Sequence, residues 1–113
     1  MKKGVNYLGE FELIVMLAIL RLGPDAYGMR IWEEIEARTG RKSLIAAVYA
    51  ALERLERKKY VSSWFGDPTP ERGGRAKRYF KIENPGYAAL ERTTSMFISM
   101  WPADAPVSLI GGS

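Results

Sequence analysis

The chain has 113 residues and a net charge of +4 at pH 7, which fit one compact domain and favour an anionic partner such as nucleic acid or an acidic membrane surface. It contains no cysteine and no histidine, which excludes disulfides, cysteine-based zinc sites, thiol nucleophiles and the commonest general base. No glycine-rich phosphate loop follows a strand pattern, and no acidic residues cluster at ligand spacing. We therefore expect neither an enzyme nor a cofactor or metal site.

Three helices are predicted in the first half of the chain. Apolar residues recur at helical spacing over residues 8–22, and Gly23-Pro24-Asp25 ends this segment because proline disfavours helix in the residue before it. A second helix is predicted over residues 27–38, closed by Gly40 in a left-handed cap. The third runs through SLIAAVYAALERLERKK with Ser43 as its N-cap, and its predicted buried stripe consists of Leu44, Val48, Ala51, Leu52 and Leu55.

The first helix contains the apolar run FELIVMLAIL, which is too short to span a membrane. A spanning helix needs about 20 apolar residues, and Glu10 and Glu12 flank or interrupt this run. Acidic residues precede it and no small-residue cleavage site follows, which is unlike a signal peptide. We expect a buried helix in a cytoplasmic protein without a membrane partner.

A hairpin with a basic tip is predicted after the third helix. The segments YVSSWF and RAKRYFKI have the β-branched, aromatic and alternating character of strands, and GDPTPERGG between them consists of turn residues. Glycines at the tip let backbone approach phosphate closely, and the cations around them would neutralise it. Arg78 is expected either to join these cations or to pair within the sheet.

A last helix is predicted to begin at Pro85 and to stop at Pro102. Its apolar residues are spaced four, three and four apart, which is a short heptad-like seam. We expect a second copy of the chain to cover this seam, because a single helix with so much apolar surface more often pairs with another copy; packing on its own domain is the alternative. Trp101 is also a candidate for stacking on an aromatic ligand, with a plain interface anchor as the alternative. The predicted interface residues are Leu90, Thr94, Phe97, Ile98 and Trp101.

Three helices, a two-stranded hairpin and a further helix give the layout of a winged helix-turn-helix, a mainly α fold with a small β wing. We assign residues 1–84 to this DNA-binding domain, 85–101 to a dimerisation helix and 102–113 to a loose tail. In such folds the third helix enters the major groove and the wing lies against the backbone or minor groove. The expected DNA contacts are Lys42, Ser43, Ala46, Tyr49, Ala50 and Arg54 from the third helix, and Arg72, Gly73, Gly74, Arg75 and Lys77 from the wing.

Two of these contacts have an alternative. Tyr49 follows Val48 and therefore points away from the buried stripe, but a half-buried tyrosine can also simply pack against its neighbours. Arg54 can contact phosphate or form an ion pair within its own helix.

Four blocks of the sequence resemble the PadR-type transcriptional regulators. The blocks are LGEFELIVMLAILRLG, DAYGMRIWEEIEARTG, AVYAALERLERK and TPERGGRAKRYFKI, and their order and gaps match that family from about Leu8 to Leu90. The resemblance implies a dimeric repressor whose C-terminal helix pairs the subunits and whose DNA is released by a small molecule, often aromatic or phenolic. Dimer symmetry then requires a palindromic operator on double-stranded DNA. The single C-terminal helix is similar to that of the short family members.

Two positions depart from the family pattern. The third helix of the family usually opens with a Ser-x-Gly stretch, where this chain has Leu44-Ile45-Ala46. The family also tends to have glycine at the end of this helix, where this chain has Lys59, a residue that is disfavoured in a left-handed cap. The first departure keeps open an alternative function, a winged-helix module that binds small molecules or another protein and has reduced or lost DNA binding.

Overall fold

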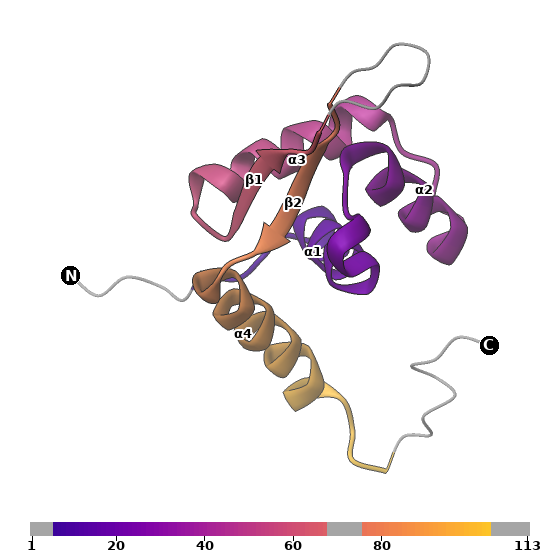
Figure 1. Cartoon of the computed structure of the whole chain (residues 1–113). Coiled ribbons are helices and arrows are strands. Elements are labelled where there is room, and N and C mark those ends of the chain that lie inside the picture. Colours follow the sequence, from indigo (N-terminus) through magenta and orange to yellow (C-terminus); the bar gives the residue numbers. More distant parts are fainter. Residues whose placement is uncertain (1–5, 68–75, 105–113) are drawn as a thin grey trace.

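The computed structural model describes residues 6–67 and 76–104, which form four α-helices and a two-stranded antiparallel sheet (Figure 1). This is the expected winged helix-turn-helix arrangement. Within the described residues, no helix has the length and apolar character that a membrane crossing requires. The elements in chain order are α1 (Glu10–Leu22), the short 3-10 helix η1 (Gly23–Asp25), α2 (Gly28–Thr39), α3 (Ile45–Arg57), β1 (Val61–Phe65), β2 (Arg78–Ile82) and α4 (Asn84–Met100).

The core lies between the first three helices and the hairpin, and α1 is its central element because it contacts α2, α3 and β2 (Figure 1). Apolar residues at helical spacing on each helix turn to this core, as the periodicity predicts. Full burial of one such side chain contributes about 1.5–3 kcal/mol. The largest apolar side chains that are fully buried are Phe80, Met16, Ile31, Ile35, Leu52, Leu55, Val15, Val48 and Val61.

The start of α3 differs from the prediction at two residues. Helix α3 begins at Ile45 with Leu44 as its extended N-cap, so the assignment of Ser43 as N-cap is wrong. Leu44 consequently precedes the first turn and is 77% exposed, whereas the other four members of its predicted stripe are buried. A distant contact explains the shift, since the indole Nε1 of Trp32 donates a hydrogen bond to the Ser43 carbonyl at 2.8 Å.

The end of α3 has a left-handed residue that is not glycine. Lys59 has φ 66°, its amide donates to the Glu56 carbonyl at 2.9 Å, and the amide of Tyr60 donates to the Leu55 carbonyl at 3.0 Å. These two bonds form the Schellman pattern that commonly closes helices with glycine. The left-handed backbone costs a lysine about 1 kcal/mol more than a glycine. The strained residue turns the chain from α3 directly into β1.

The hairpin is fixed to the helical core at its base. Val61 pairs with Ile82 and both side chains are buried, so one face of the hairpin covers the core. Strand β2 also bonds to the segment before α2, because the amide of Phe80 donates to the carbonyl of Ala26 at 2.9 Å. The direction of the wing is therefore set jointly by α2 and α3.

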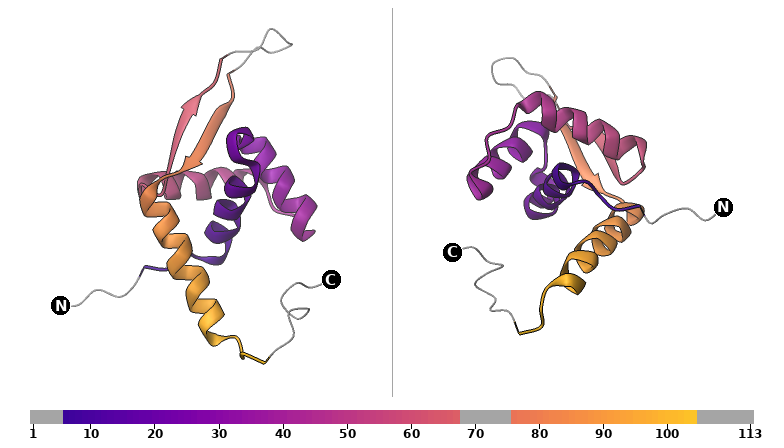
Figure 2. Two further views of the ribbon diagram at one scale, coloured as in Figure 1. Left: turned by 60° about the horizontal axis from the view of Figure 1, so that its bottom comes forward. Right: turned by 180° about the vertical axis from the view of Figure 1, so that it is seen from behind.

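Helix α4 packs on the domain with its first half and extends away from it with its second half (Figure 2). At Gly86 the helix approaches so closely that a Cβ atom would collide with the backbone oxygen of Tyr60. Thr93 is completely buried, and its hydroxyl accepts a hydrogen bond from the amide of Leu8 at 3.0 Å. Leu90 belongs to this buried half and to the core of its own domain, which is the alternative packing of the predicted seam.

Candidate nucleic-acid interface

One face of α3 points to solvent and carries the residues predicted from the middle of the helix. Ala46, Tyr49 and Ala50 are all exposed, three and four positions apart, and therefore lie together. Two of them are small, so another surface can approach the helix backbone at this point. Lys42, in the turn before α3, is also exposed.

The ring of Tyr49 lies over the first residue of α2. Gly28 is buried beneath the phenol, and a Cβ atom built on it would overlap the phenol oxygen. Tyr49 as a whole remains 40% exposed, and its hydroxyl lies against Gly28 in the first turn of α2. The first amides of a helix have no partner within the helix, and the N-cap residue Tyr27 supplies no side-chain hydrogen bond to them. Tyr49 thus packs on Gly28, and its contact with DNA stays a prediction.

Ser43 does not offer its hydroxyl to a partner. Its Oγ is buried and has no hydrogen-bond partner in the part of the chain that the structure describes. The neighbouring Arg41 pairs with Glu10 at 3.1 Å, and its guanidinium lies 5.3 Å from the centre of the Phe11 ring. The turn between α2 and α3 is therefore tied to the start of α1.

Arg54 turns towards α1, which the sequence did not indicate. Its Nε lies 3.4 Å from Oε2 of Glu12, and Nζ of Lys58 lies 3.2 and 3.1 Å from the two oxygens of the same carboxylate. The Glu12 side chain is only 9% exposed. Burial alone raises the pKa of Glu12, but hydrogen bonds from Lys58, the Gly9 amide and Arg54 outweigh it, so the pKa lies below its usual value.

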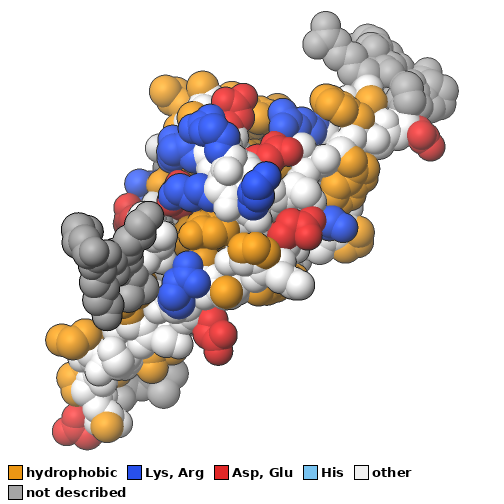
Figure 3. Space-filling view, turned by 90° about the vertical axis from the view of Figure 1, so that its left-hand side faces the viewer, with side chains coloured by type: hydrophobic (Ala, Val, Ile, Leu, Met, Phe, Trp, Pro, Cys, Tyr) orange, Lys and Arg blue, Asp and Glu red, His pale blue; other side chains and the backbone are white. Residues whose placement is uncertain are grey.

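Lysine and arginine side chains gather on the side of the molecule shown in Figure 3, with a few carboxylates among them. The end of α3 contributes to the positive charge of the surface, since Arg54, Arg57, Lys58 and Lys59 reach solvent there. The carboxylate of Glu12 is engaged with two of these four cations, so less of this charge is free than the sequence suggests.

The wing is described only near its base. Arg72, Gly73, Gly74 and Arg75 lie outside the described residues, and only Lys77 among the predicted wing contacts lies within them. The ammonium of Lys77 is 4.8 Å from the centre of the Tyr27 ring, a cation–π contact that joins the wing to the start of α2.

The neighbouring Arg78 bonds within the sheet, as the second expectation had it, and also forms an ion pair with α3. Its NH2 lies 2.6 Å from Oε1 of Glu56, and its Nε donates to the Ser63 hydroxyl on the paired strand at 3.0 Å.

An aromatic cluster supports the wing, and the sequence patterns did not reveal it. Tyr79 stacks on Trp64 with ring centres 5.8 Å apart and meets Tyr27 edge-on at 5.5 Å. Trp64 and Tyr79 are opposite each other on β1 and β2, which is the cross-strand position where aromatic pairs interact. The register of the two strands would have predicted the Trp64–Tyr79 pair. It would not have predicted the contact with Tyr27, which lies outside the hairpin, before α2.

The second half of α4 has an apolar surface that is exposed to solvent. Phe97 and Ile98 are 58% and 70% exposed, and Trp101 is also exposed just after the last helical turn. Phe97 lies four positions after the buried Thr93, so it continues the stripe that packs on the domain. The Thr94 hydroxyl is occupied by the Leu90 carbonyl at 2.9 Å. The sequence-predicted seam is thus exposed only in its C-terminal half.

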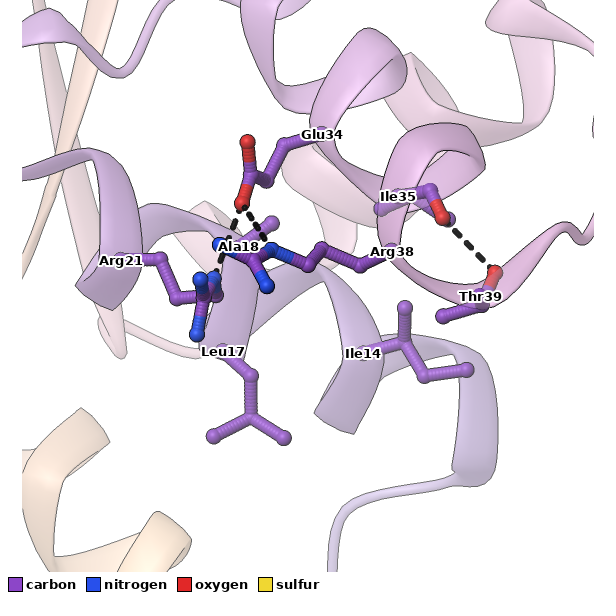
Figure 4. Close-up of a pocket in the computed structure, with 8 residues that line it drawn as sticks. All are labelled: Ile14, Leu17, Ala18, Arg21, Glu34, Ile35, Arg38 and Thr39. Atoms are coloured by element: carbon purple, nitrogen blue, oxygen red, sulfur yellow. Dashed lines mark hydrogen bonds and ion pairs between the residues drawn. The ribbon is translucent and has the colours of Figure 1, made fainter. Parts of the chain in front are cut away.

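A cavity of about 200 Å³ lies between α1 and α2 (Figure 4). Arg21 and Arg38 both approach the same oxygen of Glu34, at 2.9 and 3.3 Å. The hydrogen bond from Arg21 holds the pKa of Glu34 below its usual value, and Arg38 adds to this effect. These ion pairs join the two helices at one side of the cavity, and Ile14, Leu17, Ala18, Ile35 and Thr39 line the rest of it.

Comparisons with known proteins identify the family. The sequence pattern described as the Transcriptional regulator PadR-like family matches residues 16–92. A Lysinibacillus sphaericus protein named Uncharacterized protein X is 36% identical over 84 residues, which cover 73% of this chain and 72% of that protein.

Two similar structures have the same fold. A PadR family transcription regulator from Clostridium difficile R20291 is 22% identical with a TM-score of 0.65, over 80% of this chain and 90% of that one. A PadR family transcriptional regulator from Eggerthella lenta DSM 2243 is 21% identical with a TM-score of 0.62, over 80% and 79%. Because the family pattern covers well over half of its length, the chain belongs to the PadR-like family of transcriptional regulators.

Proposed function

We propose that the protein is a dimeric DNA-binding repressor whose α3 helix enters the major groove. The observation that carries this proposal is the exposed face of α3 together with a wing in which residues 69–81 contain five cations and one acid. In helix-turn-helix proteins the second helix of the motif makes the base contacts, and here that helix is α3. Ala46 and Ala50 allow its backbone to approach the groove closely.

Tyr49 and Lys42 are proposed to contact phosphate. The Tyr49 hydroxyl lies against Gly28, the first residue of α2, and we propose that one phosphate accepts hydrogen bonds from this hydroxyl and from the first amides of that helix. Lys42 precedes α3 and neutralises a phosphate as the helix enters the groove. Arg54 is left out of this set because Glu12 engages it, and Ser43 because its hydroxyl is buried.

Leu44 is proposed to read bases. The departure from the family pattern puts an apolar side chain, 77% exposed, at the N-cap of α3. Residues at the start of a recognition helix reach base edges, and an apolar side chain there can contact the methyl group of thymine. The departure therefore changes the bases that are read and does not by itself remove DNA binding.

The wing is proposed to bind the backbone or minor groove through Arg72, Arg75 and Lys77. Each phosphate neutralised by the protein contributes about 0.9 to the slope of log affinity against log salt. Replacing Arg72 and Arg75 by alanine should lower that slope by about one to two units on any sequence. An unchanged slope would remove the wing from the mechanism.

The dimer is proposed to form through the exposed half of α4. Phe97, Ile98 and Trp101 form an apolar surface that the domain itself does not cover, and a second copy brings an identical surface to it. Repression would end when an aromatic effector stacks on Trp101 and stabilises a spacing of the two α3 helices that does not fit the operator.

Selection of bound fragments from random duplex DNA tests the proposal. We expect an enriched palindrome whose half-sites are about 34 Å apart, or a multiple of that distance. Failure to retain any duplex at low salt would instead favour the alternative function, a winged-helix module that binds a small molecule or a protein. For the effector, quenching of tryptophan fluorescence by planar phenolics and cationic dyes should be lost in Trp101→Ala and weakened by operator DNA. Quenching that survives in this variant at full affinity would contradict a site at Trp101.

A further inference from the structure

The buried carboxylate of Glu12 joins the first turn of α1 to the last turns of the helix proposed to read DNA. It accepts hydrogen bonds from Lys58 at 3.1 and 3.2 Å and from Arg54 at 3.4 Å, and also from the amide of Gly9 at 3.4 Å. Arg54 and Lys58 are one helical turn apart at the end of α3, so a single acid engages both. The pattern of α3 alone does not predict this arrangement, because the partners are 42 and 46 positions apart in sequence.

A phosphate group and the Glu12 carboxylate compete for the same two cations. Both are compact anions that accept charge-assisted hydrogen bonds from guanidinium and ammonium groups. The Glu12 side chain is buried while those of Arg54 and Lys58 are nearly half exposed, so the cations could reach a DNA backbone if they were released. While Glu12 holds them, Arg54 and Lys58 contribute little to the non-specific affinity of the protein for DNA.

We propose that Glu12 is a specificity-determining residue, which restrains Arg54 and Lys58 and so limits binding to DNA of arbitrary sequence. The inference rests on the proposed DNA-binding function. Specificity is the ratio of operator affinity to non-specific affinity, and the non-specific part comes almost entirely from phosphate contacts. Keeping two cations of α3 on an internal acid raises that ratio without any new base contact.

The test is the salt dependence of binding to a random-sequence duplex, compared between the full-length wild-type protein and Glu12→Gln. Glutamine keeps the size and one acceptor oxygen but loses the charge that holds the cations. If the released cations neutralise one or two more phosphates, the affinity of the variant should fall about 3- to 12-fold more than that of the wild-type protein between about 50 and 200 mM salt. The ratio of operator affinity to random-duplex affinity should fall as well.

Two further variants make the result specific. Glu91→Gln removes the same charge from an exposed position on α4 for which no ion pair is seen among the described residues, and it should leave the slope unchanged. Lys58→Gln should leave the slope of the wild-type protein unchanged but remove about one phosphate contact from the slope of Glu12→Gln. This second comparison also distinguishes released cations from a general loosening of the fold.

The outcomes are separable. Equal slopes for the wild-type protein and Glu12→Gln, or an equal increase from Glu91→Gln, would overturn the role of Glu12 while leaving DNA binding intact. Absence of binding to any duplex by the wild-type protein would overturn the proposed function and this inference together.

Discussion

The phenol of Tyr49 on α3 occupies the space directly above Gly28 on α2, where any larger residue would displace it. The position of the ring therefore depends on the absence of a side chain 21 positions earlier in the sequence. This contact places a residue that we propose as a phosphate ligand at the junction of the two helices of the helix-turn-helix motif.

Gly28→Ala should weaken operator binding without destabilising the protein. Alanine favours helix more than glycine does, and the atoms it displaces, Oη, Cζ and Cε1 of Tyr49, form the outer end of a movable side chain. Loss of one hydrogen bond to a charged phosphate corresponds to about tenfold in affinity per half-site. Titration of labelled operator measures the change in affinity, and a melting curve of the same sample checks that stability is unchanged. In a Tyr49→Ala background the substitution should have no further effect, and an undiminished effect there would contradict the role of the ring.

Phe97→Asp should convert a dimer into a monomer. Phe97 is largely exposed in the single chain, so the charge costs little there but several kcal/mol when a second copy covers it. Sedimentation at micromolar concentration measures the change, and operator affinity should fall because one half-site binds weakly. Ala88→Asp is the matched control, since Ala88 is exposed on the opposite side of α4. Dimers that persist in Phe97→Asp would place the interface elsewhere.

Leu44 should recognise a thymine methyl group. Replacing each thymine of the selected operator by uracil removes only that methyl, and the sensitive position should lose about fourfold in affinity per half-site, the value of one buried methyl group. Leu44→Ala should bind the thymine and uracil operators with equal affinity. If the alanine variant still distinguishes the two operators, another residue reads the methyl.

Lys59→Gly should stabilise the fold. Glycine adopts the left-handed conformation of this Schellman cap without the steric cost that lysine meets, so we expect a gain of about 0.5–1 kcal/mol in the free energy of unfolding. That corresponds to a rise of about 2–8 °C in melting temperature. Lys59→Ala separates the backbone effect from loss of the side chain and should not stabilise. An equal rise in both variants would argue that the lysine charge, not its backbone, is unfavourable.

The contribution of Glu12 to stability should disappear in acid. Its pKa in the folded protein lies below the ordinary value of 4.5, so the folded state favours the charged carboxylate. The contribution is therefore fully present above about pH 4.5 and is lost as the pH falls through the folded pKa. Melting temperatures of the wild-type protein and Glu12→Gln should differ at neutral pH, and the difference should shrink as the pH falls below 4.5 and through the folded pKa. A constant difference over this range would show that its charge does not matter.

Local sequence patterns were sufficient for the winged helix but not for its long-range contacts. The predicted first helix, residues 8–22, ends at Leu22 as observed, because the Gly23-Pro24 break is a local signal. The start of α3 was misplaced, since the Trp32 indole that holds the Ser43 carbonyl comes from another helix.

In the candidate site, too, local patterns predicted which residues are exposed but not their contacts with other elements. The apolar periodicity correctly predicted that Tyr49 is exposed, because the buried stripe of a helix also determines which residues lie on its solvent-facing side. It could not show that Arg54 bonds to Glu12, since nothing in the α3 pattern specifies which acid of α1 lies beside it. Leu90 and Phe97 share one stripe, but only the packing of α4 on the domain shows where burial ends.

The contact of Gly86 with the Tyr60 carbonyl has a mechanical consequence for a dimer. The backbone of α4 lies directly against the backbone of the chain where it leaves α3 and enters β1, because Gly86 has no side chain to separate them. We therefore expect the first half of α4 and the domain to rotate together. A small change in the angle between two paired α4 helices would be transmitted undiminished, and would appear as a larger displacement at the far ends, where each α3 meets its half-site.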